Sequence, residues 1–145
     1  MTEPLLKVDG LKKYFPIRSG LLSKKVGYVK AVDDISFFVN EGETLGIVGE
    51  SGCGKSTTGR MLMRLLEPTE GKVTFEGKEL TSISDSAMRK VRRDIQMVFQ
   101  DPYSSLNPRM SVRSLLTEVL NVQMGMQGKE ANDRVIQLLE EVGLG

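Results

Sequence analysis

The stretch GESGCGKST, residues 49–57, decides the fold class of this chain. It matches the pattern G-x-x-x-x-G-K-[ST] at every fixed position. A short apolar run, TLGIV (44–48), precedes it, and apolar residues at helical spacing follow it over residues 55–66. Strand, glycine-rich loop and helix in this order predict a phosphate-binding loop in an α/β nucleotide-binding core. A chance glycine-rich turn, the alternative interpretation, explains neither the strand nor the helix.

The residue types in this loop suit an oxyanion for separate physical reasons. Gly49, Gly52 and Gly54 permit backbone conformations with positive φ, so that amide N–H groups can surround the anion. Lys55 would place a positive charge on the β and γ oxygens of a nucleotide, and the Ser56 hydroxyl is placed to ligate Mg²⁺. The helix that starts at Lys55 points its positive dipole end at the same anion. The remaining candidate contacts with a nucleoside triphosphate are Glu50, Ser51, Cys53 and Thr57.

Composition limits the chemistry available to these 145 residues. The sequence contains no histidine, which excludes a histidine-based acid–base site, a Ser–His triad and most zinc sites. Cys53 is the single cysteine, so an internal disulfide is impossible and a reducing cytosol is expected. The Cys53 thiol could be reactive because it precedes a helix N-terminus, or it could be a small spacer in the loop. No apolar run is long enough to suggest a membrane span.

Charge is unevenly distributed along the chain. Residues 1–30 contain seven Lys or Arg and two acidic residues, whereas residues 31–50 contain five acidic residues and no basic one. A basic first segment could face an anionic membrane surface, or it could be a solvated strand and loop. The basic residues concerned are Lys12, Lys13, Arg18, Lys24 and Lys25.

Periodicity and turn residues predict the other elements. An irregular basic stretch is expected over residues 14–27, because it contains the breakers Pro16, Gly20 and Gly27. Ser111 is a plausible N-cap and Gly143 suits a C-cap. The expected strands are 5–11, 28–39, 44–48, 95–99 and, with a tight turn, 72–80. The expected helices are 55–66, 84–93, 111–124 and 129–142, the last two forming a helical insertion that begins near residue 101.

The predicted strand 95–99 is followed by Gln100. A Walker B strand would end directly in the aspartate that holds Mg²⁺, whereas Asp101 comes one position later. The Gln100 amide oxygen could ligate Mg²⁺ or orient a water molecule, but a neutral amide is no strong base. We therefore interpret Gln100 as a sensor of bound nucleotide, with a slipped Walker B strand as the alternative. Gln100 and Lys55 are the candidate catalytic-site residues, and Ser56 and Gln100 are the candidate metal ligands.

Two segments together resemble the ATP-binding subunits of ABC transporters, in the oligopeptide, dipeptide, nickel and glutathione importer branch. They are GETLGIVGESGCGKST (42–57) and IQMVFQDPYSSLNPRM (95–110), and the second makes the resemblance specific. The resemblance implies a P-loop NTPase core with an antiparallel β subdomain over residues 1–100. Residues 101–145 would then begin the α-helical subdomain, and Gln100 would correspond to the Q-loop glutamine.

This resemblance also implies a function. Members of the family use ATP and Mg²⁺, and hydrolysis drives uptake of peptides or a related small solute. Membrane-spanning subunits would dock at the Q-loop and helical region, and a second ATP-binding subunit, identical or homologous, would complete the ATPase pair. The protein would be peripheral to the cytoplasmic face of the membrane and would have no nucleic-acid partner. Peptide, nickel and glutathione remain open as the transported solute.

Family members also stack an aromatic side chain on adenine. Alignment of VDGLKKYF (8–15) with the family's usual strand places Phe15 in that position. Tyr14 and Tyr28 remain candidates, because residues 16–27 resemble an insertion. For each of the three rings, a packing role is an equally good interpretation.

The sequence ends with EEVGLG (140–145), and it lacks the family's LSGGQ-type signature, Walker B strand, catalytic glutamate, D-loop and switch histidine. We therefore expect it to correspond to the N-terminal part of a longer subunit, and to bind nucleotide at most, with hydrolysis weak or absent. Uncovered strand edges would also predict low stability and aggregation. Two other functions stay open: a non-catalytic piece that docks a membrane subunit, and a small-molecule kinase, which would need an arginine-rich lid and an acceptor pocket.

Overall fold

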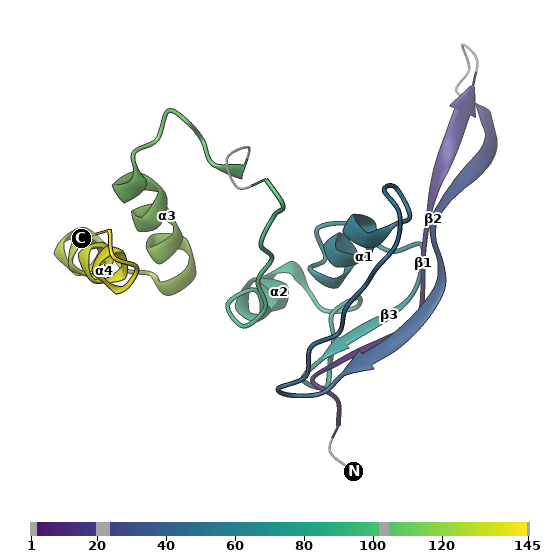
Figure 1. The fold of residues 1–145 in the computed structure, drawn as a ribbon, viewed down its shortest axis with the longest axis horizontal. Coiled ribbons are helices and arrows are strands. Elements are labelled where there is room, and N and C mark those ends of the chain that lie inside the picture. The colour runs from purple at the N-terminus through teal and green to yellow at the C-terminus, as the bar shows by residue number, and fades with distance from the viewer. Residues whose placement is uncertain (1–2, 20–23, 102–104, 145) are drawn as a thin grey trace. The chain divides into compact units, whose positions relative to one another are not determined.

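The computed structural model describes residues 3–19, 24–101 and 105–144 (Figure 1). The chain divides into two compact units, Met1–Met97 and Val98–Gly145, and each is described by itself. The first unit combines an antiparallel sheet with two helices, and the second contains a pair of helices.

A four-stranded antiparallel sheet frames the first unit, with the strand order β2-β1-β3-β4 (Figure 1). β1 (Leu6–Ser19) pairs with β2 (Lys24–Val39) on one side, and its first half pairs with β3 (Glu70–Phe75) on the other. β3 turns into the short β4 (Lys78–Glu79) through two residues with positive φ, which is typical of a tight hairpin turn. The predicted strand and turn over residues 72–80 are thereby confirmed.

The hairpin of β1 and β2 is longer than its sequence predicts. The irregular stretch predicted over residues 14–27 was wrong for its described part, because residues 14–19 and 24–27 are strand. Pro16 lies opposite Tyr28, beyond the point where β3 pairs with β1. A two-stranded ribbon leaves one edge of each strand unpaired, so a proline can be accommodated there. Gly20 lies outside the described residues.

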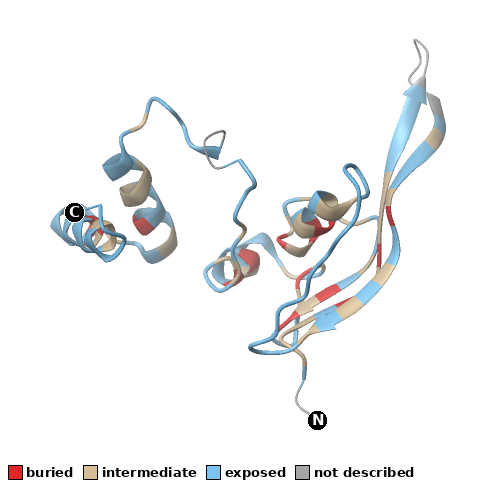
Figure 2. Ribbon diagram, viewed as in Figure 1, coloured by how far each residue is buried: buried red, intermediate tan, exposed pale blue. Residues whose placement is uncertain are grey.

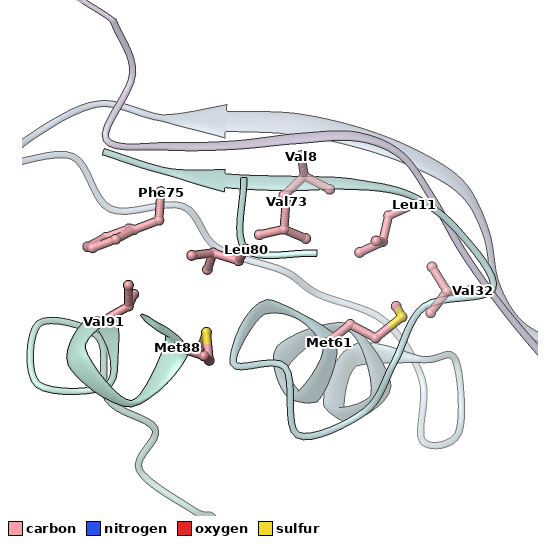
Figure 3. Packing of buried hydrophobic residues seen from close by; sticks show 9 residues of the cluster. All are labelled: Val8, Leu11, Val32, Met61, Val73, Phe75, Leu80, Met88 and Val91. Atoms are coloured by element: carbon pink, nitrogen blue, oxygen red, sulfur yellow. The ribbon is translucent and has the colours of Figure 1, made fainter. Parts of the chain in front are cut away.

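The core of the first unit lies between the sheet and the helices α1 (Lys55–Leu62) and α2 (Asp85–Val91), as Figure 3 shows. Strand residues point inward at alternate positions, so that the sheet contributes one apolar face to this layer. Figure 2 shows the same layer as the place where buried positions gather in this unit. The buried cluster consists of Val8, Leu11, Val32, Met61, Val73, Phe75, Leu80, Met88 and Val91.

α1 ends four residues earlier than predicted. Arg64 adopts a positive φ of 48°, which stops the helix. The Arg64 guanidinium donates to the carbonyl of Ile83 at 2.6 Å and pairs with Asp85 at 3.3 Å, so the end of α1 is tied to the start of α2. α2 is capped by Ser84, whose Oγ accepts from the Ala87 N–H at 3.3 Å.

Two predicted strands do not form in the described chain. Residues 44–48 and 95–99 carry no strand assignment, and the prediction for both was wrong. A strand requires a ladder with a neighbour as well as apolar residues, and the described residues supply no such ladder for either segment. Leu45, Ile47 and Val48 are instead 44%, 48% and 92% exposed. An exposed apolar run of this kind favours association with another surface, and the expected low stability of the unit stays a prediction.

The second unit contains α3 (Val112–Met124) and α4 (Gly128–Glu141), which agree with the two predicted helices. Ser111 caps α3 as predicted, since its Oγ accepts from the Ser114 N–H at 3.2 Å. Gly143, with a φ of 75°, follows α4 and confirms the predicted helix end. Among the described residues of this unit, the buried side chains are Leu120, Ala131 and Val135.

Replacement of Leu11 by alanine should destabilise the first unit strongly. Leu11 is fully buried at the centre of the cluster, and a Leu→Ala change at such a site costs about 2–5 kcal/mol. Urea unfolding followed by circular dichroism and tyrosine fluorescence measures the loss. Leu65→Ala is the matched control, because Leu65 is 52% exposed and should lose far less. Equal losses in both variants would contradict the assignment of the core.

Candidate functional site

The predicted phosphate loop lies between β2 and α1, and Figure 2 shows it as an exposed segment. Gly54, with a φ of 97°, is the N-cap of α1, and Lys55 is the first residue of the helix. The Lys55 ammonium donates to the carbonyl of Gly49 at 2.7 Å and to the carbonyl of Glu50 at 2.6 Å. These two bonds link the first residue of the helix to the start of the loop, so the Lys55 charge lies against the backbone of residues 49 and 50.

Gly54 is where the loop touches the sheet. A Cβ atom at this position would lie 2.3 Å from the carbonyl oxygen of Ala31 and 3.3 Å from Cγ2 of Val32. The first distance is too short for any side chain, and the positive φ disfavours one as well. Only glycine therefore allows the start of α1 to rest directly on the backbone of β2.

The N-terminus of α1 is free to receive an anion. Gly54 has no side chain, so no side-chain cap accepts from the first-turn N–H groups. Thr58, which is buried, holds the turn in place because both its N–H and its Oγ1 donate to the Gly54 carbonyl, at 2.8 and 3.0 Å. Ser56 is exposed, with its hydroxyl on the same helical turn. The helix start thus joins uncapped N–H groups, a hydroxyl and the lysine in one place, which fits a phosphate group.

Cys53 packs inside this loop. Its Sγ lies 3.5 Å from the Lys55 ammonium, and a Cβ at Gly49 would come within 2.5 Å of it. The close fit against Gly49 agrees with the role of a small spacer. The thiol is exposed, so the alternative of a reactive thiol also stays open.

The three candidate aromatic rings lie on two faces of the hairpin. Cross-strand partners share a face, and Phe15 pairs with Val29 while Lys13, two residues before Phe15, pairs with Val32. Two steps along β1 thus oppose three along β2, a register shift between Lys13 and Tyr14 across which alternation does not assign a common face. Phe15 is placed instead by Lys13, whose ammonium lies 5.2 Å from the Phe15 ring centroid and donates to the Glu67 carbonyl, in the segment that follows α1. Tyr14 pairs with Lys30 and Tyr28 pairs with Pro16, which places both tyrosines on the opposite face.

The Tyr14 side chain also contacts residues of β2. Its hydroxyl donates to Asp33, whose other carboxylate oxygen accepts from Lys30 at 3.1 Å. These bonds lower the pKa of Asp33, with the Tyr14 bond the larger cause, and the Asp33 carboxylate raises the pKa of Tyr14. Lys30 further lies over the Tyr14 ring, 5.1 Å from its centroid. The Tyr14 side chain is thus bonded within a surface network of β2, whereas Phe15 is 39% exposed.

Residues 67–70, which follow α1 in the chain, bond to three successive residues of β1. Lys12 pairs with Glu70 at 2.9 Å, which raises the pKa of Lys12, and the Tyr14 N–H donates to Oγ1 of Thr69 at 2.9 Å. Between them, the Lys13 ammonium donates to the carbonyl of Glu67 at 2.5 Å. Sequence reasoning grouped Lys12 and Lys13 with the basic residues and missed these contacts. These contacts join residues 54 to 58 positions apart, so no local signal in the sequence indicated them.

Gln100 is exposed and belongs to the second unit, whereas the phosphate loop belongs to the first. Its predicted place beside a bound nucleotide therefore stays a prediction. Of the basic residues considered for a membrane surface, Arg18 is exposed, and the side chains of Lys24 and Lys25 lie outside the description.

A glycine-rich loop that leads into an uncapped helix N-terminus and encloses its own lysine defines a P-loop nucleotide-binding protein. The family model described as "ABC transporter" matches residues 32–145, and the chain belongs to this family. The fold expected from the sequence, an ABC-type nucleotide-binding core with an antiparallel β part and helices, is confirmed.

Curated relatives and solved structures agree with this assignment. The chain is 54% identical over 143 residues to the oligopeptide transport ATP-binding protein AppF of Bacillus subtilis, and 49% identical over 142 residues to the glutathione import ATP-binding protein GsiA of Pectobacterium atrosepticum. Each match covers 98% of this chain, but 44% and 23% of those proteins, so the chain spans less than half of either. The dimeric ATP-binding cassette MJ0796, solved in a post-hydrolysis state with ADP and Pi, is 27% identical with a TM-score of 0.76. That match covers 93% of this chain and 56% of the cassette.

Replacement of Gly54 by alanine should destabilise the loop more than an equivalent change elsewhere. The positive φ alone costs alanine about 1–2 kcal/mol, and relief of the contact with the Ala31 carbonyl adds on the order of 1–3 kcal/mol. Thermal unfolding of the variant measures the sum. Gly42→Ala is the control, since Gly42 has a φ of 74° with no atom within 4 Å of its Cβ position. If both variants unfold alike, the loop does not rest on β2 as described.

Proposed function

We propose that this chain binds ATP through the phosphate loop, and that it forms part of the ATP-binding subunit of an ABC importer. In the intact subunit, hydrolysis of ATP would drive uptake of peptides or a related small solute. The observation that carries the proposal is the helix start at Gly54 and Lys55, where uncapped N–H groups and an enclosed ammonium meet. The names of AppF and GsiA, an oligopeptide and a glutathione ATP-binding protein, support the solute class.

Different residues of the loop would contact different parts of the nucleotide. Lys55 would exchange its carbonyl partners for the β and γ phosphate oxygens, and the backbone N–H groups of residues 50–57 would surround them. The exposed Ser56 hydroxyl, an oxygen ligand of the kind that Mg²⁺ prefers, would hold the metal together with Gln100. Bound Mg²⁺ supplies charge neutralisation at the phosphates. Gln100 would report on the nucleotide and orient water, without acting as a base.

Phe15 is our proposed contact for the adenine base. It is partly exposed and contacts Lys13, which is bonded to the segment that follows α1, whereas Tyr14 is bonded to Asp33 on the opposite face of the ribbon. A ring stacked on a base gains from dispersion and from burial, and it tolerates any base because each has a flat face.

The second unit is the proposed contact with membrane-spanning subunits. One side of α3 carries exposed apolar residues at helical spacing, with Val112 at 59%, Val119 at 57% and Val122 at 72%. Such a stripe fits a partner that covers it, and residues 101–145 would accordingly belong to the α-helical subdomain. No helix in the described parts of the chain has the length and apolar character of a membrane span. We propose a peripheral position at the cytoplasmic face and a second ATP-binding subunit, identical or homologous.

Binding of a fluorescent ATP analogue in the presence of Mg²⁺ tests the proposal. Lys55→Ala removes the enclosed charge and should weaken binding by roughly tenfold or more, because a charge-assisted hydrogen bond contributes about 1.5–3 kcal/mol. Lys78→Ala, on the exposed short strand β4, should bind like the wild type. Absence of binding by the folded wild-type chain, or equal affinity of Lys55→Ala and wild type, would refute the proposal.

Hydrolysis by these 145 residues alone should be very slow or absent. The sequence contains no histidine, and the apolar run of residues 95–99 is followed by Gln100 instead of a carboxylate. Release of phosphate from Mg·ATP, measured beside the Lys55→Ala variant, should stay at the level of that variant. Sustained turnover that depends on Lys55 would show that the residues present suffice for catalysis.

A further inference from the structure

We propose that Lys13 positions the Phe15 ring for the adenine base, an inference that rests on the proposed function of the site. Lys13 and Phe15 are two residues apart on β1, on either side of a register shift against β2, and their side chains meet. The Lys13 ammonium lies 5.2 Å from the centroid of the Phe15 ring. This is the geometry of a cation–π contact, in which the positive charge is attracted to the face of the ring.

The Lys13 ammonium has a second contact, with the protein backbone. It donates to the Glu67 carbonyl at 2.5 Å, so it bridges the ring and the chain segment that follows α1. The neighbouring residues of β1 are tied to the same segment, through the Lys12 pair with Glu70 and the Tyr14 N–H bond to Thr69. Lys13 thus connects the aromatic ring to the part of the chain that directly follows the helix of the phosphate loop.

An aromatic ring has two faces, and the ammonium covers one of them. Phe15 is 39% exposed, and a purine would stack on the ring face away from the ammonium. Without the ammonium, the ring would gain rotamer freedom that a bound base must remove again. Lys13 would therefore act through Phe15, and it would affect the recognition of the base without affecting that of the phosphates.

The chain contains a matched control for this arrangement. Lys30 lies 5.1 Å from the centroid of the Tyr14 ring, which is the same kind of contact on the opposite face of the hairpin. A change at Lys30 removes a positive charge and a cation–π contact of similar geometry, but it leaves Phe15 untouched. General effects of charge on nucleotide binding can thus be separated from an effect through the Phe15 ring.

Calorimetric titration with Mg·ATP and with inorganic tripolyphosphate tests the inference. Lys13→Met should weaken ATP binding by up to about fivefold, because positioning the ring cannot contribute more than the exposed cation–π contact itself, and it should leave tripolyphosphate binding unchanged. Lys13→Arg, which keeps a cation over the ring, should restore ATP binding, and Lys30→Met should match the wild type. Phe15→Leu should weaken ATP binding at least as much as Lys13→Met.

The outcomes separate this inference from the proposed function. If the wild-type chain binds neither ligand, the proposed function fails and the inference fails with it. If Phe15→Leu weakens ATP binding but Lys13→Met does not, the role of Lys13 alone is overturned. If Lys13→Met weakens ATP and tripolyphosphate equally, Lys13 stabilises the loop or the fold as a whole, and the positioning role is also overturned.

Discussion

The contact between Gly54 and the backbone of Ala31 is the constraint on which the site depends. The chain leaves β2, passes through an exposed loop without regular structure, and returns to β2 at this one glycine. There the helix α1 begins, and one turn and a half later Met61 enters the core beside Leu11 and Val32. The Gly54 contact and the buried Met61 together fix the direction of the helix axis, and hence the position of its N–H groups. A larger residue at Gly54 would move both the loop and the helix.

β1 connects the proposed phosphate site to the proposed base contact. It lies between β2 and β3 in the sheet, and its residues 12–14 are bonded to the segment that follows α1. Phe15 comes immediately after these bonds, at the point where the sheet narrows to a two-stranded ribbon. Phe15 can therefore be exposed while its strand is fixed.

The sequence predicted correctly those features of the fold that depend on residues close together in the chain. The phosphate loop, the Ser111 cap and the glycine after α4 were found because each depends on residues close together in the chain. The segments 44–48 and 95–99 were predicted as strands from their apolar character, but pairing depends on a distant neighbour. The hairpin around Pro16 was not predicted, because Pro16 and Gly27 suggested an irregular segment. Pairing between β1 and β2 nevertheless forms a strand there. The contact of Lys13 with the Glu67 carbonyl joins residues 54 positions apart, and no local pattern predicts it.

The most direct test of this account is an amide NMR titration of the chain with Mg·ATP. If the loop is held on β2 in a form ready for phosphate, the largest changes should occur at the backbone N–H groups of residues 49–57. Smaller changes should occur at Phe15 and its strand neighbours, while the amides of the Val8 and Val73 pair in the sheet stay unmoved. Saturation without any change at residues 49–57, or changes spread evenly over the sheet, would contradict the assignment of the phosphate site to the loop that rests on β2 at Gly54.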